Sequence, residues 1–451
     1  EIIEICKAVP LSRLRYSHLI GQSGDKADEL FYLVQSGKIK EKKEALNALY
    51  PGDKYPNEAF WHLKQKLIDR VTNTIISLHD NEESEILAEF RMLQKKCHAY
   101  KLLRAKGQRQ AALWIGERAI KKSIKFDFTE ITLSLARELA RYFASVKVDK
   151  RKYQHYKQLM IRYQELANQE MEIEDCFNEV VFHFTNRKYH DDSFIAMVRE
   201  KVEIVKSILS APTSFRNILL GYNVITYYYN LVKDDKGLLE ACEDAIQRME
   251  ALPYKPPYTS VFSFLIKTLP INIQNGRYDT AQETINKCQN LVPIDSHNWM
   301  VTQQYQVILN FYREAYRKNL KLVREIKNKH TKTIQNHIEV WRLYEAYACF
   351  MTGEKIRLGK FLNEVPKFSK DKRGMNINIL ILQILFLLQE GKTNEIIDRM
   401  DALERYSYRY LRKDQTFRSN CFIHMLLQLE KGYFNRKAVE RKAKRFTDRL
   451  Q

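Results

Sequence analysis

Residues 270–293 read PINIQNGRYDTAQETINKCQNLVP, and Gly276 separates two stretches of helical apolar periodicity within them. The same arrangement of a turn between two helical stretches recurs along the C-terminal half of the chain. A fixed period of about 20–50 residues is typical of stacked helix hairpins, none of which buries its core alone. The sequence therefore predicts a helical-repeat solenoid, an architecture that usually serves as a binding surface. The turn points are Gly237, Gly276, Lys318-Asn319, Gly353, Gly391 and Gly432, with gaps of 39, 77, 38 and 41 residues between successive glycines.

The unit around Gly276 resembles the second half of a tetratricopeptide repeat. In that family a glycine at the turn, an aromatic residue, two small residues seven apart and a closing proline recur, and here they are Gly276, Tyr278, Ala281, Cys288 and Pro293. The resemblance implies that two helices cross closely at the small residues. It covers about residues 85–451, although the period of 38–41 residues exceeds the roughly 34 of the family and most of the first-helix pattern is absent. The same frame recurs at Gly107, Ala112 and Ala119, and in weaker form at Gly237, Cys242 and Met249.

We therefore predict an all-α fold. A right-handed α-solenoid of antiparallel helix pairs is expected over residues 83–451, after a small N-terminal helical unit over residues 1–82. Low counts of glycine and proline, 14 and 10 in 451 residues, favour long helices over short strands. A basic helix within residues 431–449 is expected to cap the array. The helices expected before the regular array span residues 85–106, 109–122, 130–144, 153–168, 173–184, 193–209 and 215–232.

The N-terminal unit is predicted to hold three helices, at residues 25–35, at residues 40–50 and after Pro56. Their outline resembles a helix-turn-helix, in which exposed side chains of one helix enter a groove of DNA. On the third helix the candidates for such contacts are Lys64, Lys66 and Arg70. The alternative is that these helices cap the solenoid or dock to a protein.

The balance of charge is strongly basic, because Lys plus Arg number 75 against 55 Asp plus Glu, a formal net charge of +20. This surplus indicates an acidic partner, which is a protein, a nucleic acid or an anionic lipid. No apolar stretch reaches the roughly 18–20 residues that span a bilayer, and no signal peptide is visible. Seven widely spaced cysteines without a CxxC pair indicate buried free thiols in a reducing compartment, so a cytoplasmic location is expected.

The sequence offers no catalytic motif, and we expect a protein without enzymatic activity, metal or cofactor. Its eleven histidines show no metal-ligand spacing. Residues 390–393, EGKT, resemble the end of a phosphate-binding loop, but that motif needs a glycine where this chain has Phe386. We interpret these residues as a turn between two helices.

The densest positive charge lies at residues 91–125, where eleven basic residues face the single acid Glu117. A solvated helix face usually interleaves opposite charges, so this segment is the candidate for binding an acidic partner. A weaker set, Arg405, Arg409 and Arg412, alternates with tyrosines in a pattern suited to single-stranded nucleic acid. The candidate contacts of the 91–125 segment are Lys95, Lys96, Lys101, Arg104, Lys106, Arg109, Arg118, Lys121, Lys122 and Lys125.

These patterns leave two main functions open. The first is a non-enzymatic scaffold or adaptor that holds acidic protein partners within a larger complex, with its charge speeding their encounter. The alternative is a nucleic-acid-associated regulator, in which the helix-turn-helix-like unit or the basic 91–125 face contacts DNA or RNA. Beside these two main functions, a third hypothesis is an enzyme or effector subunit whose chemistry lies on a partner.

Overall fold

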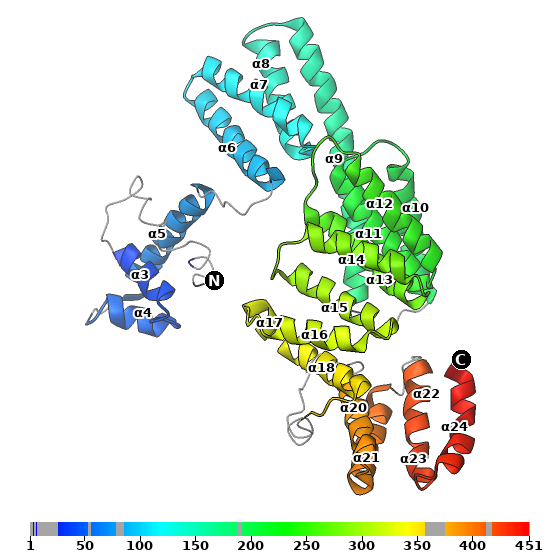
Figure 1. Cartoon of the computed structure of the whole chain (residues 1–451). Helices are drawn as coiled ribbons and strands as arrows, with labels where there is room; N and C mark the ends of the chain where they lie inside the picture. The colour runs from blue at the N-terminus through cyan, green and yellow to red at the C-terminus, as the bar shows by residue number, and fades with distance from the viewer. Residues whose placement is uncertain are drawn as a thin grey trace. The chain divides into compact units, whose positions relative to one another are not determined.

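A computed structural model describes residues 26–52, 56–77, 85–186, 192–356, 375–411 and 417–450, together with Ile3 and Cys6 (Figure 1). Every regular element in this described part is a helix, which confirms the predicted all-α class. The chain divides into two compact units, Glu1–Ala99 and Tyr100–Gln451. The division falls inside helix α6 (Glu85–Ala105), whereas the sequence predicts a boundary after residue 82, which lies outside the described residues.

The first unit contains three packed helices, α3 (Lys26–Gln35), α4 (Lys42–Leu49) and α5 (Pro56–Ser77). The carboxylate of Glu44 accepts a hydrogen bond from the backbone N–H of Glu41 at 3.1 Å, which supports the start of α4. Arg70 of α5 donates to Asp28 of α3 at 3.0 Å. The core between these helices is formed by apolar side chains that include Leu30, Phe31, Leu67 and Val71.

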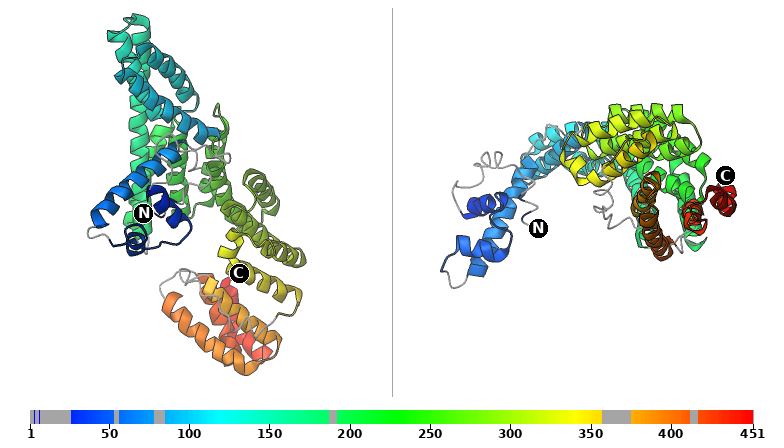
Figure 2. Two further views of the ribbon diagram at one scale, coloured as in Figure 1. Left: turned by 90° about the vertical axis from the view of Figure 1, so that its left-hand side faces the viewer. Right: turned by 60° about the horizontal axis from the view of Figure 1, so that its bottom comes forward.

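The second unit is a succession of helices, most of which pack against the helix that follows. Figure 1 shows this order, and α20 and α21 lie side by side in both views of Figure 2. The described helices thus form the neighbouring pairs of a helical-repeat solenoid. Their bounds are α7 (Arg109–Lys125), α8 (Thr129–Ser145), α9 (Lys150–Asn186), α10 (Asp192–Leu209), α11 (Phe215–Val232), α12 (Asp235–Glu250), α13 (Tyr258–Gln274), α14 (Tyr278–Leu291), α15 (His297–Tyr312), α16 (Tyr316–Lys327), α17 (Lys332–Asn336), α18 (Ile338–Thr352), α20 (Met375–Gln389), α21 (Thr393–Leu411), α22 (Phe417–Leu426), α23 (Gln428–Lys431) and α24 (Arg436–Leu450).

Helix α9 is continuous over 37 residues, so the prediction of separate helices at 153–168 and 173–184 is wrong. The residues between them, 169–172, read QEME and contain neither glycine nor proline, so nothing in the backbone interrupts the helix. Within this stretch Glu170 is buried and accepts a hydrogen bond from Thr129 of α8. Glu174, one turn further along the helix, pairs with Arg216 of α11 at 2.8 Å. One helix therefore packs against α8, α10 and α11.

The turns at Gly276, Gly353 and Gly391 are confirmed. Their φ angles are +70°, +74° and +70°, in the left-handed region that favours glycine. Helix C-termini commonly end in this conformation, as the C-cap of α18 does at Gly353.

Two of the predicted turn points are wrong, because Gly237 lies in the first turn of α12 and Lys318-Asn319 in the first turn of α16. The residues that adopt the left-handed conformation before these helices are Lys233, with φ 58°, and Glu314, with φ 57°. Neither is a glycine, and the sequence therefore gives no signal there. With Glu314 in place, the left-handed residues at 276, 314, 353 and 391 are 38, 39 and 38 residues apart, which is more regular than the predicted period.

Replacing Glu314 with glycine is expected to raise the free energy of unfolding by about 0.5–1 kcal/mol, because glycine adopts positive φ without the steric penalty of a Cβ. Denaturation followed by circular dichroism measures the change. The matched control is Gly353→Ala, where the added Cβ meets no atom within 4 Å. This substitution introduces backbone strain at a positive φ, whereas E314G removes it, so G353A should lower the free energy of unfolding. A less stable E314G variant, or a G353A variant at least as stable as the parent chain, would contradict the assignment of these turns.

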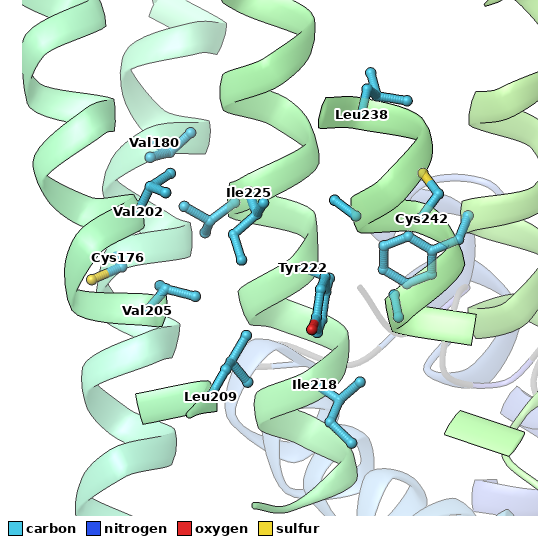
Figure 3. Packing of buried hydrophobic residues seen from close by; sticks show 14 of the residues in the cluster. Cys176, Val180, Val202, Val205, Leu209, Ile218, Tyr222, Ile225, Leu238 and Cys242 are labelled. Carbon is cyan, nitrogen blue, oxygen red and sulfur yellow. The ribbon is translucent and has the colours of Figure 1, made fainter. Parts of the chain in front are cut away.

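Several small residues of the repeats are buried. Ala281 and Cys288 of α14 are fully buried, as are Ala119 of α7 and Cys242 of α12. In the largest core of the central repeats, side chains of α9, α10, α11 and α12 fill the space between the helices (Figure 3). Val202 of α10 and Ile225 of α11 point toward one another in this view. Small side chains and branched apolar side chains thus share the core between the helices.

Two carboxylates, one half-buried on Asp127 and one buried on Glu170, join α8, α9 and α11. Asp127, which precedes α8, accepts a hydrogen bond from the backbone N–H of Phe215 at 2.8 Å. Glu170 of α9 accepts from the hydroxyl of Thr129 at 2.6 Å. Burial raises the pKa of Asp127 and of Glu170 above their ordinary values.

Because the folded chain binds the Glu170 proton more tightly than the unfolded chain, this group stabilises the fold at low pH, and its contribution is lost as the pH rises through the folded pKa. We expect Glu170→Gln to become progressively more stable than the parent chain as the pH rises from about 4 through the folded pKa, by about 1.4 kcal/mol for each unit of the shift. Urea denaturation across this range measures the difference. Glu172→Gln, at an exposed position of the same helix, is the control and should show no such trend.

Candidate functional site

Helix α7 has two opposite faces. The buried face packs closely, because a Cβ added to Gly116 would lie 2.9 Å from a ring carbon of Tyr100, a distance that real Cβ atoms do not show. Glycine at this position therefore lets α7 approach Tyr100 closely. The buried residues follow helical spacing and are Ala112, Gly116, Ala119, Ile120 and Ser123.

The face of α7 opposite the buried one is a stripe formed by Trp114, Arg118, Lys121 and Lys125, which we call the α7 stripe. At 100° per residue these four positions fall within a narrow arc of the helix. The indole of Trp114 is 58% exposed, and the guanidinium of Arg118 lies 3.9 Å from its ring centroid. Arg118, Lys121 and Lys125 are exposed, and none of them forms an ion pair with a residue that the structure describes. The stripe thus combines an exposed aromatic ring with three uncompensated positive charges.

Two acids, one on α7 and one on the neighbouring helix α8, are engaged with other basic residues. Glu117, the single acid of the 91–125 segment, accepts a hydrogen bond from Lys152 of α9 at 2.7 Å. Glu138 of α8 pairs with Arg104, and also with Arg141 at 3.5 Å. Arg104 therefore joins α6 to α8, and its charge is compensated within the fold.

The remaining candidates of the 91–125 segment differ in position. Lys101, Lys106, Arg109 and Lys122 are exposed in the second unit, at the end of α6, in the turn after it and on α7. Lys95 and Lys96 are half-buried on the part of α6 that belongs to the first unit, and the structure does not place them against the α7 stripe.

The weaker candidates are dispersed. On α5, Lys66 is exposed and Lys64 half-buried, while the Arg70 side chain is only 11% exposed and pairs with Asp28. Arg70 therefore holds α5 to α3. Arg405 is exposed on α21, Arg409 lies on the same helix, and Arg412 is outside the described residues.

Sequence reasoning missed one lysine, Lys267 of α13. Its ammonium group donates to Asn223 at 2.7 Å and to the hydroxyl of Thr226 at 2.9 Å, both on α11. Burial lowers the pKa of Lys267 to about 8. The signal in the sequence is a single charged residue within the apolar run VFSFLIKTLPINI, residues 261–273. The residues that carry the family resemblance all lie after Lys267, so that pattern gives no role to this lysine.

Other chemistry is sparse in the described residues. Among them, no group of three or more His, Cys, Asp and Glu side chains is arranged to hold a metal ion. The seven cysteines are free, and burial raises the pKa of the Cys242 thiol to about 11, which disfavours the reactive thiolate. No described helix combines the length and the apolar character that crossing a membrane requires.

No protein-family model matches this chain, and no curated protein matches it either.

Proposed function

We propose that this protein is a non-enzymatic binding scaffold whose solenoid, similar to tetratricopeptide repeats, holds an acidic protein partner within a larger complex. The α7 stripe is the contact surface of this proposal. A cytoplasmic location fits the free cysteines, because thiols stay reduced in that compartment.

The observation that carries the proposal is the exposed pairing of Trp114 with Arg118 beside Lys121 and Lys125. Tryptophan and arginine are the residues that most often dominate the binding energy of protein interfaces, and here an exposed pair of them lies beside two exposed lysines. The stacked ring holds the guanidinium in one orientation, which lowers the entropy lost when a partner carboxylate binds. The two lysines add the attraction that speeds encounter with an acidic surface.

The test is crosslinking in the source cells with a photoreactive residue in place of Ala111, an exposed position beside the stripe on α7. We expect an adduct that protease removes and nuclease leaves intact. In a variant that also carries R118E, K121E and K125E, the yield of this adduct should fall by about tenfold or more, because the attraction becomes repulsion.

The matched control carries K437E, R441E and K444E on α24, where three exposed basic residues lie on one helix face. It makes the same change of net charge away from the stripe and should keep the adduct. An adduct that nuclease destroys, or one that both triple variants lose equally, would overturn the proposal.

The alternative function is nucleic-acid binding by the same stripe, which the stacking of Arg118 on Trp114 also favours because aromatic rings and guanidinium groups stack on bases. In that case the full chain should retain a single-stranded oligonucleotide, and the affinity should fall as salt rises from 50 to 200 mM, by about 20-fold for the three phosphate contacts that Arg118, Lys121 and Lys125 can make. R118E, K121E and K125E should abolish this retention.

A further inference from the structure

A cavity of about 460 Å³ opens beside Lys267 within the second unit. It is bordered by α9, α11, α12 and α13, with Tyr305 of α15 also at its wall. Much of the lining is apolar and is contributed by side chains that include Phe177, Val180, Leu238 and Ile266. A volume of this size accommodates a small organic molecule or two neighbouring side chains of a peptide.

The ammonium of Lys267 lines this cavity, and its hydrogen-bond partners carry no charge. Its two hydrogen bonds go to an amide oxygen, on Asn223, and to a hydroxyl, on Thr226. Among the described residues no carboxylate forms an ion pair with it. Asp235 also lines the cavity, but it is exposed in the first turn of α12, where water screens its charge.

The two neutral partners hold Lys267 in a fixed direction and leave part of its binding capacity unused. A lysine ammonium carries three donors, and the described residues accept from two of them. The ring of Phe264 lies 4.8 Å from the nitrogen and supplies a further weak attraction. Lys267 is half-buried, and a partly desolvated positive charge without a carboxylate destabilises the free chain. An anion that enters the cavity would relieve this penalty.

We propose that this cavity binds a carboxylate attached to an apolar segment, with Lys267 as the ion-pair partner and the α9, α12 and α13 side chains covering the apolar part. The third N–H of the ammonium is the donor to the carboxylate. The apolar walls exclude water from this ion pair and so strengthen it. This site goes beyond the proposed scaffold function, because it uses no residue of the α7 stripe.

The test is reductive methylation of the full chain at pH 7, with the rate at Lys267 read by mass spectrometry against exposed Lys287 in the same sample. Only the neutral amine reacts, so a carboxylate that raises the pKa by one unit slows the reaction of Lys267 about tenfold. The probes are hexanoate and the peptide acetyl-Leu-Glu-Leu-amide, and their controls are hexanol and the peptide with glutamine in place of glutamate. We expect the anionic probes alone to protect Lys267.

Protection by hexanoate but not by the glutamate peptide would identify a small organic acid as the ligand class, and protection by the peptide would identify an acidic side chain of a protein. Titration calorimetry with the protecting probe should show binding to the parent chain and none to the K267M variant. Equal protection by hexanol and hexanoate, or no protection by either anionic probe, would overturn the proposal. In the variant that carries R118E, K121E and K125E, the anionic probes should protect Lys267 as strongly as in the parent chain. Failure of this site and failure of the scaffold function are therefore distinguishable.

Discussion

Trp341→Ala is expected to lower the free energy of unfolding by about 3–5 kcal/mol, the largest effect of any single substitution considered for this chain. Trp341 of α18 is fully buried. It belongs to a core with Val323 and Ile326 of α16 and Ile334 of α17. Truncation removes the apolar contacts and leaves a cavity that these neighbours cannot fill without moving.

Urea denaturation followed by circular dichroism measures this loss without relying on tryptophan fluorescence. The matched control is Trp114→Ala, the same substitution at an exposed position, which should change stability by less than about 0.5 kcal/mol. Trp341→Phe should cost much less than the alanine variant, because it keeps an aromatic ring and removes an indole N–H that has no hydrogen-bond partner among the described residues. Equal destabilisation by W341A and W114A would contradict the core assignment.

Lys267→Met is expected to act in the opposite direction and to stabilise the free chain by about 3 kcal/mol at pH 7. The pKa of Lys267 is lowered from 10.5 to about 8 by burial, so the unfolded chain holds this proton more tightly than the folded chain does. The penalty is fully present below about pH 8 and disappears as the pH rises toward 10.5. Methionine has a similar length and no charge, and it therefore avoids the penalty.

The pH dependence separates this cause from a simple gain in packing. The stability difference between K267M and the parent should shrink steadily from pH 8 to pH 10, as the parent loses its half-buried charge. Lys287→Met, at an exposed position of α14, should show no difference that depends on pH. A stability gain for K267M that stays constant over this range would show that charge burial is not its cause.

Much of the fold could be predicted because its signals are local. The apolar periodicity and the glycines at 276, 353 and 391 give the helices and three of the turns. The turn at Glu314 could not be found, because its conformation is imposed by the packing of α15 and α16 and not by the residue itself. The continuity of α9 was also hidden, since acidic residues in mid-helix resemble those of a helix start when their partners on other helices are unknown.

The sequence predicts where the basic segment lies, but it does not predict which of its residues are exposed and unpaired. The run of bases at residues 91–125 is visible in the sequence, but only the fold shows that Arg104 is paired while Arg118, Lys121 and Lys125 share one exposed stripe. The role of Trp114 depends on its stacking with Arg118, which composition does not reveal. Lys267 acquires its surroundings from α11, about 40 residues away in sequence, and long-range contacts of this kind leave no local pattern.

The length of α9 also has a mechanical consequence. In a solenoid whose pairs are joined only by loops, the pairs at one end can open while the rest stay folded. At 1.5 Å per residue, α9 is about 55 Å long. It packs against α8 and also against α10 and α11, and no turn interrupts it between these contacts. A force or a thermal fluctuation that separates α8 from α10 and α11 must therefore bend or unfold part of α9. We expect the amide protons of α8, α9 and α11 to exchange together, as one cooperative unfolding unit.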